Sequence, residues 1–197
     1  ENHERTKHLP NRPVNSAGYL DWETGPNPFR SYEGTGPIQL PFSNIASGAN
    51  YFDLFIRKNN KLQPFSLANI ARLLELSMGL SAWKSCSGTS WALRMNPSSG
   101  NLHPTEAHLV LPPIQENNNS GGVFHYNPLS HILEPRAEFS EQFWSRLENH
   151  FDQKGFLVGL TSIHWRESWK YGERAFRYCN HDIGHVMACL SLSANLL

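Results

Sequence analysis

The feature that most constrains the fold is a long apolar pattern near the end of the sequence. From Ser168 onward, apolar residues recur at the 3.6-residue period of a helix. They are Phe176, Cys179, Ile183, Val186, Leu190 and Ala194. The final two turns are apolar nearly all round, which predicts burial on every side. We therefore expect one long core helix from Ser168 to Leu197, and we expect the chain to be a piece of a longer protein because the pattern stops without a helix-ending signal.

The rest of the chain predicts a mixture of helices and strands. The run SLANIARLLELSMGL predicts a helix over 66–79, capped by Ser66 and ended by Gly79. We expect a long loop over 80–106, a strand over 107–111, a hairpin formed by 122–127 and 131–136, a helix capped by Ser140, and an apolar strand over 156–163. This order is typical of an α+β fold.

The N-terminal residues differ in character from the rest. Residues 1–50 are rich in proline and glycine and show no sustained period. We interpret them as an extended arm that lies on a surface through Trp22, Phe29 and Tyr32, followed by a single domain over 51–197.

Composition excludes several classes of function. Seventeen basic residues balance seventeen acidic ones in 197 residues, which disfavours a nucleic-acid partner. No run approaches the roughly 20 apolar residues of a membrane helix, and the N-terminus has no signal-peptide core. The three widely spaced cysteines imply no disulfide framework. We expect a cytoplasmic protein with no membrane partner.

The run RMNPSSGNLHPTEAHLVL carries the main functional signal. PSSGN offers two hydroxyls, an amide and backbone N–H groups on a chain that Gly100 allows a ligand to approach, and Arg94 adds a positive charge. Such a surface suits a planar ligand with polar edges or a phosphate. The run would also suit an ordinary turn before a strand.

This run resembles the flavin-binding segment of the nitroreductase family, and most of all the branch of the SagB and ThcOx azoline dehydrogenases. The branch's pattern is similar to R-x-x-P-S-x-G-x-x-x-P-x-E. It is matched by Arg94, Pro97, Ser98, Gly100, Pro104 and Glu106.

Two further segments resemble the same branch, in the expected order. GVFHYNPLSHILEP is similar to its hairpin through Gly122, Phe124, Tyr126, Pro128, His131 and Leu133. WKYGERAFRYCNHDIGH is similar to its Lys-Tyr-Gly helix through Lys170, Tyr171, Gly172, Arg174, Arg177, Tyr178, Gly184 and His185.

The resemblance implies a nitroreductase-like α+β fold with a central, mostly antiparallel sheet, flanking helices and a long buried core helix. It implies an FMN-dependent oxidoreductase that exchanges hydride through flavin N5 with a small organic or peptide-derived substrate, and possible use of NAD(P)H. Lys170 and Tyr171 would be the catalytic pair. The implied flavin contacts are Arg94, Pro97, Ser98, Ser99, Gly100, Asn101 and His103. The partner would be a second copy, in a homodimer, or a second nitroreductase-like half.

One segment departs from the family pattern. The usual Arg-x-Ser-x-Arg phosphate anchor is replaced by RKNNK, in which Arg57 and Lys61 keep positive charge but Asn59 replaces the serine. A lysine does not hold phosphate in the bidentate manner of an arginine. The rival hypothesis is therefore a degenerate, non-catalytic half that serves assembly or binding.

Two more hypotheses rest on single motifs. His181, His185 and Cys189 recur at four-residue spacing, as zinc ligands on one helical face do, although Asp182 stands where a zinc protease has its glutamate. They equally suit a polar seam, and we expect no metal. Cys86 lies in a polar loop and predicts an ordinary thiol rather than a nucleophile.

Overall fold

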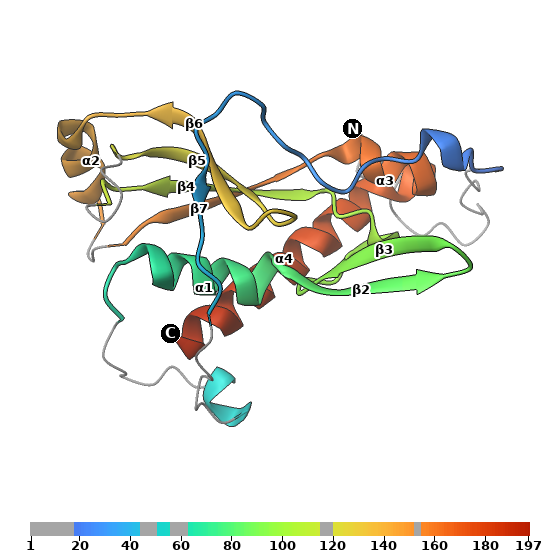
Figure 1. The fold of residues 1–197 in the computed structure, drawn as a ribbon, viewed down its shortest axis with the longest axis horizontal. Coiled ribbons are helices and arrows are strands. Elements are labelled where there is room, and N and C mark those ends of the chain that lie inside the picture. Colours follow the sequence, from blue (N-terminus) through green and yellow to red (C-terminus); the bar gives the residue numbers. More distant parts are fainter. Residues whose placement is uncertain (1–17, 44–50, 56–62, 115–119, 152–154) are drawn as a thin grey trace.

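The computed structural model describes residues 18–43, 51–55, 63–114, 120–151 and 155–197. Its main body is a five-stranded antiparallel sheet in the order β1-β6-β5-β4-β7, with α1 and α4 packed together on one side (Figure 1). The strands are β1 (Ile38–Gln39), β4 (Thr105–Leu111), β5 (Gly122–Asn127), β6 (Ile132–Glu138) and β7 (Leu157–Ser162), and β2 (Leu80–Cys86) pairs separately with β3 (Thr89–Arg94). The α-helices are α1 (Leu67–Met78), α2 (Glu141–Glu148), α3 (His164–Tyr171) and α4 (Ala175–Leu196). The α+β fold expected from the sequence is confirmed.

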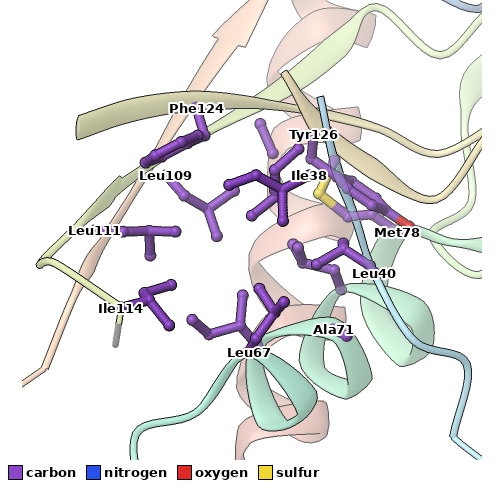
Figure 2. Close-up of a cluster of buried hydrophobic side chains, with 14 of the residues drawn as sticks. Ile38, Leu40, Leu67, Ala71, Met78, Leu109, Leu111, Ile114, Phe124 and Tyr126 are labelled. Carbon is purple, nitrogen blue, oxygen red and sulfur yellow. The ribbon is translucent and has the colours of Figure 1, made fainter. Parts of the chain in front are cut away.

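Helix α1 forms as its sequence predicts. Ser66 accepts a hydrogen bond from the Asn69 N–H at 3.3 Å, which caps the first turn. Gly79 ends the helix, and a Cβ there would lie 2.6 Å from the Glu75 carbonyl oxygen. The apolar face of α1 packs against the sheet to form the core (Figure 2).

The predicted hairpin and the second helix are also confirmed. β5 and β6 pair in antiparallel register, with Tyr126 opposite Leu133. Ser140 caps α2 by accepting from the Phe143 N–H at 3.3 Å. The predicted strands over 107–111 and 156–163 are observed as β4 and β7.

The expected loop over 80–106 is wrong in its first half. The β2–β3 hairpin occupies residues 80–94, and both of its faces are largely exposed. Its two-residue turn is formed by Ser87 and Gly88, both with positive φ, as in the type I′ turns that suit hairpins. The Ser-Gly dipeptide was the sequence signal for this turn.

The expected single helix from Ser168 is also wrong. Helix α3 begins four residues earlier and ends at Gly172, whose φ of 53° cannot continue an α-helix, and α4 begins at Ala175. The last turns of α4 are not buried on every side, because Ser191 and Ala194 are exposed. One face of α4 packs on α1 and the sheet. Phe176 and Met187 of the same helix are exposed.

The arm contacts the folded body through all three of its predicted aromatic residues. Trp22 meets Trp169 edge-on, Phe29 lies under the Arg94 guanidinium, and Tyr32 meets His125 edge-on. β1 pairs with β6, and the next residue, Leu40, is 1% exposed in the core. Within the described residues, no helix is both long enough and apolar enough to cross a membrane.

Candidate functional site

The PSSGN turn is anchored from below by Asp182 of α4. This buried carboxylate accepts from the Ser98 hydroxyl at 2.6 Å, the Ser99 hydroxyl at 3.0 Å and the Ser99 N–H at 3.0 Å. The Ser98 oxygen in turn accepts from the His103 N–H at 2.8 Å. Both hydroxyls are therefore used inside the protein, where they fix the shape of the turn.

Gly100 brings the two predicted parts of the site together. It has a φ of 63° and is exposed. A Cβ built on it would lie 2.6 Å from the Tyr171 hydroxyl and 3.0 Å from Lys170 Nζ. The end of α3 thus places the predicted catalytic pair directly against the predicted flavin-binding turn, and only glycine leaves room for both.

Tyr171 sits in a half-buried, aromatic environment. Its ring lies 4.4 Å from that of Tyr178 and 5.7 Å from Lys170 Nζ, measured to ring centroids. Burial, followed by the neighbouring Glu167, raises the pKa of the Tyr171 phenol. The phenol is therefore protonated at neutral pH and available as a proton donor.

Arg94 and His103 lie deeper than the sequence predicts. Arg94 is 6% exposed, donates to the Pro28 carbonyl and lies 5.0 Å above the Phe29 ring, so its guanidinium holds the arm. Burial lowers the pKa of Arg94 to about 10. Burial and then Arg94 lower the pKa of His103 to about 3, which keeps this imidazole neutral.

Other predicted residues have simpler positions. Asn101 donates to the Ala92 carbonyl at 2.9 Å and its side-chain oxygen lies 2.9 Å from His103 Nε2, while Pro97 is exposed. Arg57 and Lys61 lie outside the described residues. Within the described ranges, no group of three or more His, Cys, Asp or Glu is arranged to hold a metal ion.

Sequence reasoning missed a buried network of hydrogen-bonded polar side chains next to the turn. His125 bridges two carboxylates, at 2.8 Å from Glu106 and 2.7 Å from Glu134, and Glu106 also accepts from Arg166 at 2.5 Å. All four residues are at most 4% exposed. Arg166 donates to the His103 carbonyl at 2.6 Å, which ties the network to the end of the turn. Glu106 stands in the motif, but its partners are remote in sequence.

Glu167 was missed as well. Its side chain is 0% exposed, and both carboxyl oxygens lack a hydrogen-bond partner among the described residues. Burial and then Asp182 raise the pKa of Glu167 to about 8, against the opposing effect of Lys170. The site therefore contains an anchoring carboxylate and a second carboxyl that keeps its proton at neutral pH.

The structure also contains two cavities away from this turn. One of about 510 Å³ lies between the start of α1 and the end of α4, and is lined by Phe65, Ile70 and Leu197 among others. The other, of about 400 Å³, lies between the arm and the start of α3. Neither of these two cavities includes Gly100, Lys170 or Tyr171. Gly100 is exposed, and Lys170 and Tyr171 are half-buried.

The chemistry of the predicted site fits a flavin. The ends of the Lys170 and Tyr171 side chains take up the space where a Cβ of residue 100 would lie, and they place a cation and a phenol against the exposed backbone of the turn. The flavin ring is planar and carries negative charge when it is reduced. An exposed stretch of backbone with an ammonium group and a proton donor beside it suits such a ring.

Comparison with solved structures gives the same class of fold. A protein from Anabaena variabilis that is provisionally named a nitroreductase superposes with a TM-score of 0.68 at 27% identity, over 97% of this chain and 37% of its own length. A protein from Ralstonia eutropha with the same provisional name gives 0.54 at 20% identity, over 81% of this chain and 71% of its own. The E. coli microcin synthetase McbBCD complex, with truncated pro-MccB17 bound, gives 0.50 at 24% identity, over 78% and 59%.

These superpositions define a nitroreductase fold. No protein-family model and no curated protein matches the chain. On the strength of the fold and of the Anabaena relative, the chain is a member of the nitroreductase superfamily. It spans 37% of the length of that relative.

Proposed function

We propose that this chain is the FMN-binding domain of an oxidoreductase on the azoline-dehydrogenase-like branch of the superfamily. The observation that carries the proposal is the contact of Gly100 with Lys170 and Tyr171. When bound, FMN would supply hydride exchange at N5 with a reductant, for which we propose NAD(P)H, or with a small organic or peptide-derived substrate.

The residues of the turn have holding roles in this proposal. The backbone at Pro97, Gly100 and Asn101 would hold the flavin, and Asp182 keeps that surface in shape through Ser98 and Ser99. Arg57 and Lys61 are the proposed cations for the phosphate.

The two residues at the end of α3 have the chemical roles. The Lys170 ammonium would stabilise negative charge on a reduced flavin, because a cation at a half-buried position interacts more strongly with a nearby anion than one in water does. Tyr171 holds a proton on its hydroxyl beside Gly100 and would give it to, or take it from, the substrate. Both groups are half-buried, which limits competition from water.

The site needs a second protein surface to enclose a ligand. Gly100 is exposed, and α4 presents Phe176 and Met187 with exposed fractions of 48% and 59%. We propose that a second copy or a second nitroreductase-like half covers it. A cytoplasmic location stays a prediction.

One observation favours a non-catalytic half as a second candidate. Arg94 and His103 are both engaged inside the protein, and His103 is neutral, so neither is free to bind an anionic cofactor. In that case the same surface would serve assembly rather than redox chemistry.

A flavin-binding assay separates the two candidates. The purified protein is scanned for the near-ultraviolet and blue absorption bands of oxidised flavin, before and after addition of FMN and after heat release. Bands that follow the protein support the proposal, and Lys170→Ala then abolishes turnover with NAD(P)H while Lys84→Ala, on the exposed β2 strand, does not. A folded protein that neither carries nor binds FMN refutes the proposal and supports the non-catalytic half.

A further inference from the structure

Glu167 is a buried carboxyl that the fold does not explain. Buried polar groups are nearly always hydrogen-bonded, because an unpaired one costs about 1–3 kcal/mol. Yet Glu167 is 0% exposed, and neither of its oxygens has a partner within the described residues. A helix position that only needed filling would hold an apolar side chain, so the carboxyl calls for a chemical role.

The position of Glu167 points to the catalytic pair. It lies on α3 three residues before Lys170 and four before Tyr171, and residues at these spacings are neighbours on one helical face. Glu167 and Tyr171 are electrostatically coupled, because Glu167 is the second cause, after burial, of the raised pKa of the Tyr171 phenol. Glu167 thus lies on the same stretch of α3 as the two groups that border Gly100, and it is electrostatically coupled to both.

The charges around Glu167 favour its protonated form at rest. Asp182 of α4, which accepts three hydrogen bonds from the turn, is the neighbouring charge that raises the pKa of Glu167 after burial. Cys179, one turn earlier on α4, also faces it, and burial raises the pKa of that thiol to about 11. Lys170, on its own helix, is the opposing cation. Burial and a neighbouring carboxyl both disfavour the charged form of Glu167.

We propose that Glu167 is the proton-storing residue of this site and that it reprotonates Tyr171 during turnover. The inference rests on the proposed function. In the reducing direction, Tyr171 gives its hydroxyl proton to the substrate anion and becomes a phenolate. An O–H bond then breaks on Glu167 and forms on the Tyr171 oxygen, and the Lys170 ammonium offsets the new carboxylate charge. A proton from solvent restores Glu167, so one proton passes from solvent to substrate in each cycle.

The first test needs no cofactor. The full chain is labelled with carboxyl-¹³C glutamate, and the carboxyl resonances are followed by NMR between pH 4 and 10. We expect one resonance to titrate near the pKa of about 8 that burial gives Glu167, to vanish in Glu167→Gln, and to remain in the exposed control Glu138→Gln. A spectrum in which every glutamate titrates in the ordinary range overturns the inference.

The second test asks whether the proton is used. In the FMN-loaded protein, Glu167→Gln is expected to lower turnover by roughly 10- to 100-fold with unchanged FMN affinity, and Glu167→Asp to recover part of the loss. The high-pH limb of the turnover profile is expected to change in Glu167→Gln and to stay as in wild type in Glu138→Gln. Unchanged turnover in Glu167→Gln overturns this inference and leaves the proposed function standing. A different result would be a wild-type chain that does not bind FMN but still shows the glutamate resonance with a pKa of about 8. That result overturns the proposed function and, with it, the use of the stored proton.

Discussion

Replacing Gly100 by alanine is the sharpest perturbation that the site offers. The residue has a φ of 63°, a conformation that costs an L-residue roughly 1–2 kcal/mol. The new methyl would also lie 2.6 Å from the Tyr171 hydroxyl and 3.0–3.1 Å from Nζ and Cδ of Lys170. These atoms are the ends of side chains, so they will shift instead of unfolding the protein. We therefore expect Gly100→Ala to lose about 1–2 kcal/mol of unfolding free energy and, in addition, to displace the catalytic pair.

Gly88→Ala is the matched control for this variant. Gly88 has a φ of 81° in the β2–β3 turn, and a Cβ there meets nothing within 4 Å. It carries the same backbone strain without the contact. Denaturant unfolding measures the stability of both variants, and FMN titration with NAD(P)H turnover measures the site. Similar losses of stability, with turnover lost only in Gly100→Ala, are expected. Equal turnover in the two variants would show that the Gly100 contact has no part in the chemistry.

Three further substitutions test other parts of the structure. Asp182→Asn removes the charge that accepts three hydrogen bonds from the turn, and we expect a loss of about 2–4 kcal/mol in chemical denaturation together with weaker FMN binding. Arg166→Met leaves Glu106 without its arginine, so about 3–5 kcal/mol should be lost, whereas the exposed control Arg146→Met should stay within about 0.5 kcal/mol of wild type. Glu167→Gln tests the pH dependence of stability. The folded wild type keeps a proton on Glu167 that the unfolded chain releases above pH 4.5. The unfolding free energy of wild type should therefore fall relative to that of the variant as pH rises from 4.5 to about 8, by about 3–5 kcal/mol at about 1.4 kcal/mol per pKa unit. Parallel stability curves across that range would contradict the assignment.

Local sequence signals predicted the elements that depend on local chemistry. Ser66 and Ser140 cap helices because a hydroxyl before an amphipathic run satisfies a free N–H, wherever the helix later packs. The hairpin of β5 and β6 follows from alternation and a turn. The β2–β3 hairpin had equally local signals in its Ser-Gly turn, but its exposed strands lack the apolar alternation of a half-buried sheet.

The arrangement of the site residues depends on contacts between segments that are far apart in the sequence. The resemblance named Pro97–Asn101 and Lys170–Tyr171 separately, and only the fold shows that they meet at Gly100. The residues around Asp182 in the sequence suggested a zinc-like motif. Nothing near it in the sequence indicates that its carboxyl accepts hydrogen bonds from Ser98 and Ser99 of the turn. The same holds for His125, whose two carboxylate partners come from different strands.

The arm also covers one edge of the sheet, because its strand β1 pairs with β6. β1 covers one side of β6 with only two paired residues, and Leu40 and the Tyr32 N–H, which donates to Glu134, hold it there. A fragment that began at residue 51 would leave the backbone groups of β6 unpaired and an apolar gap beside them. Unpaired strand edges of this kind template association with further strands. Recombinant versions trimmed to the apparent start of the domain are therefore expected to aggregate, whatever they bind.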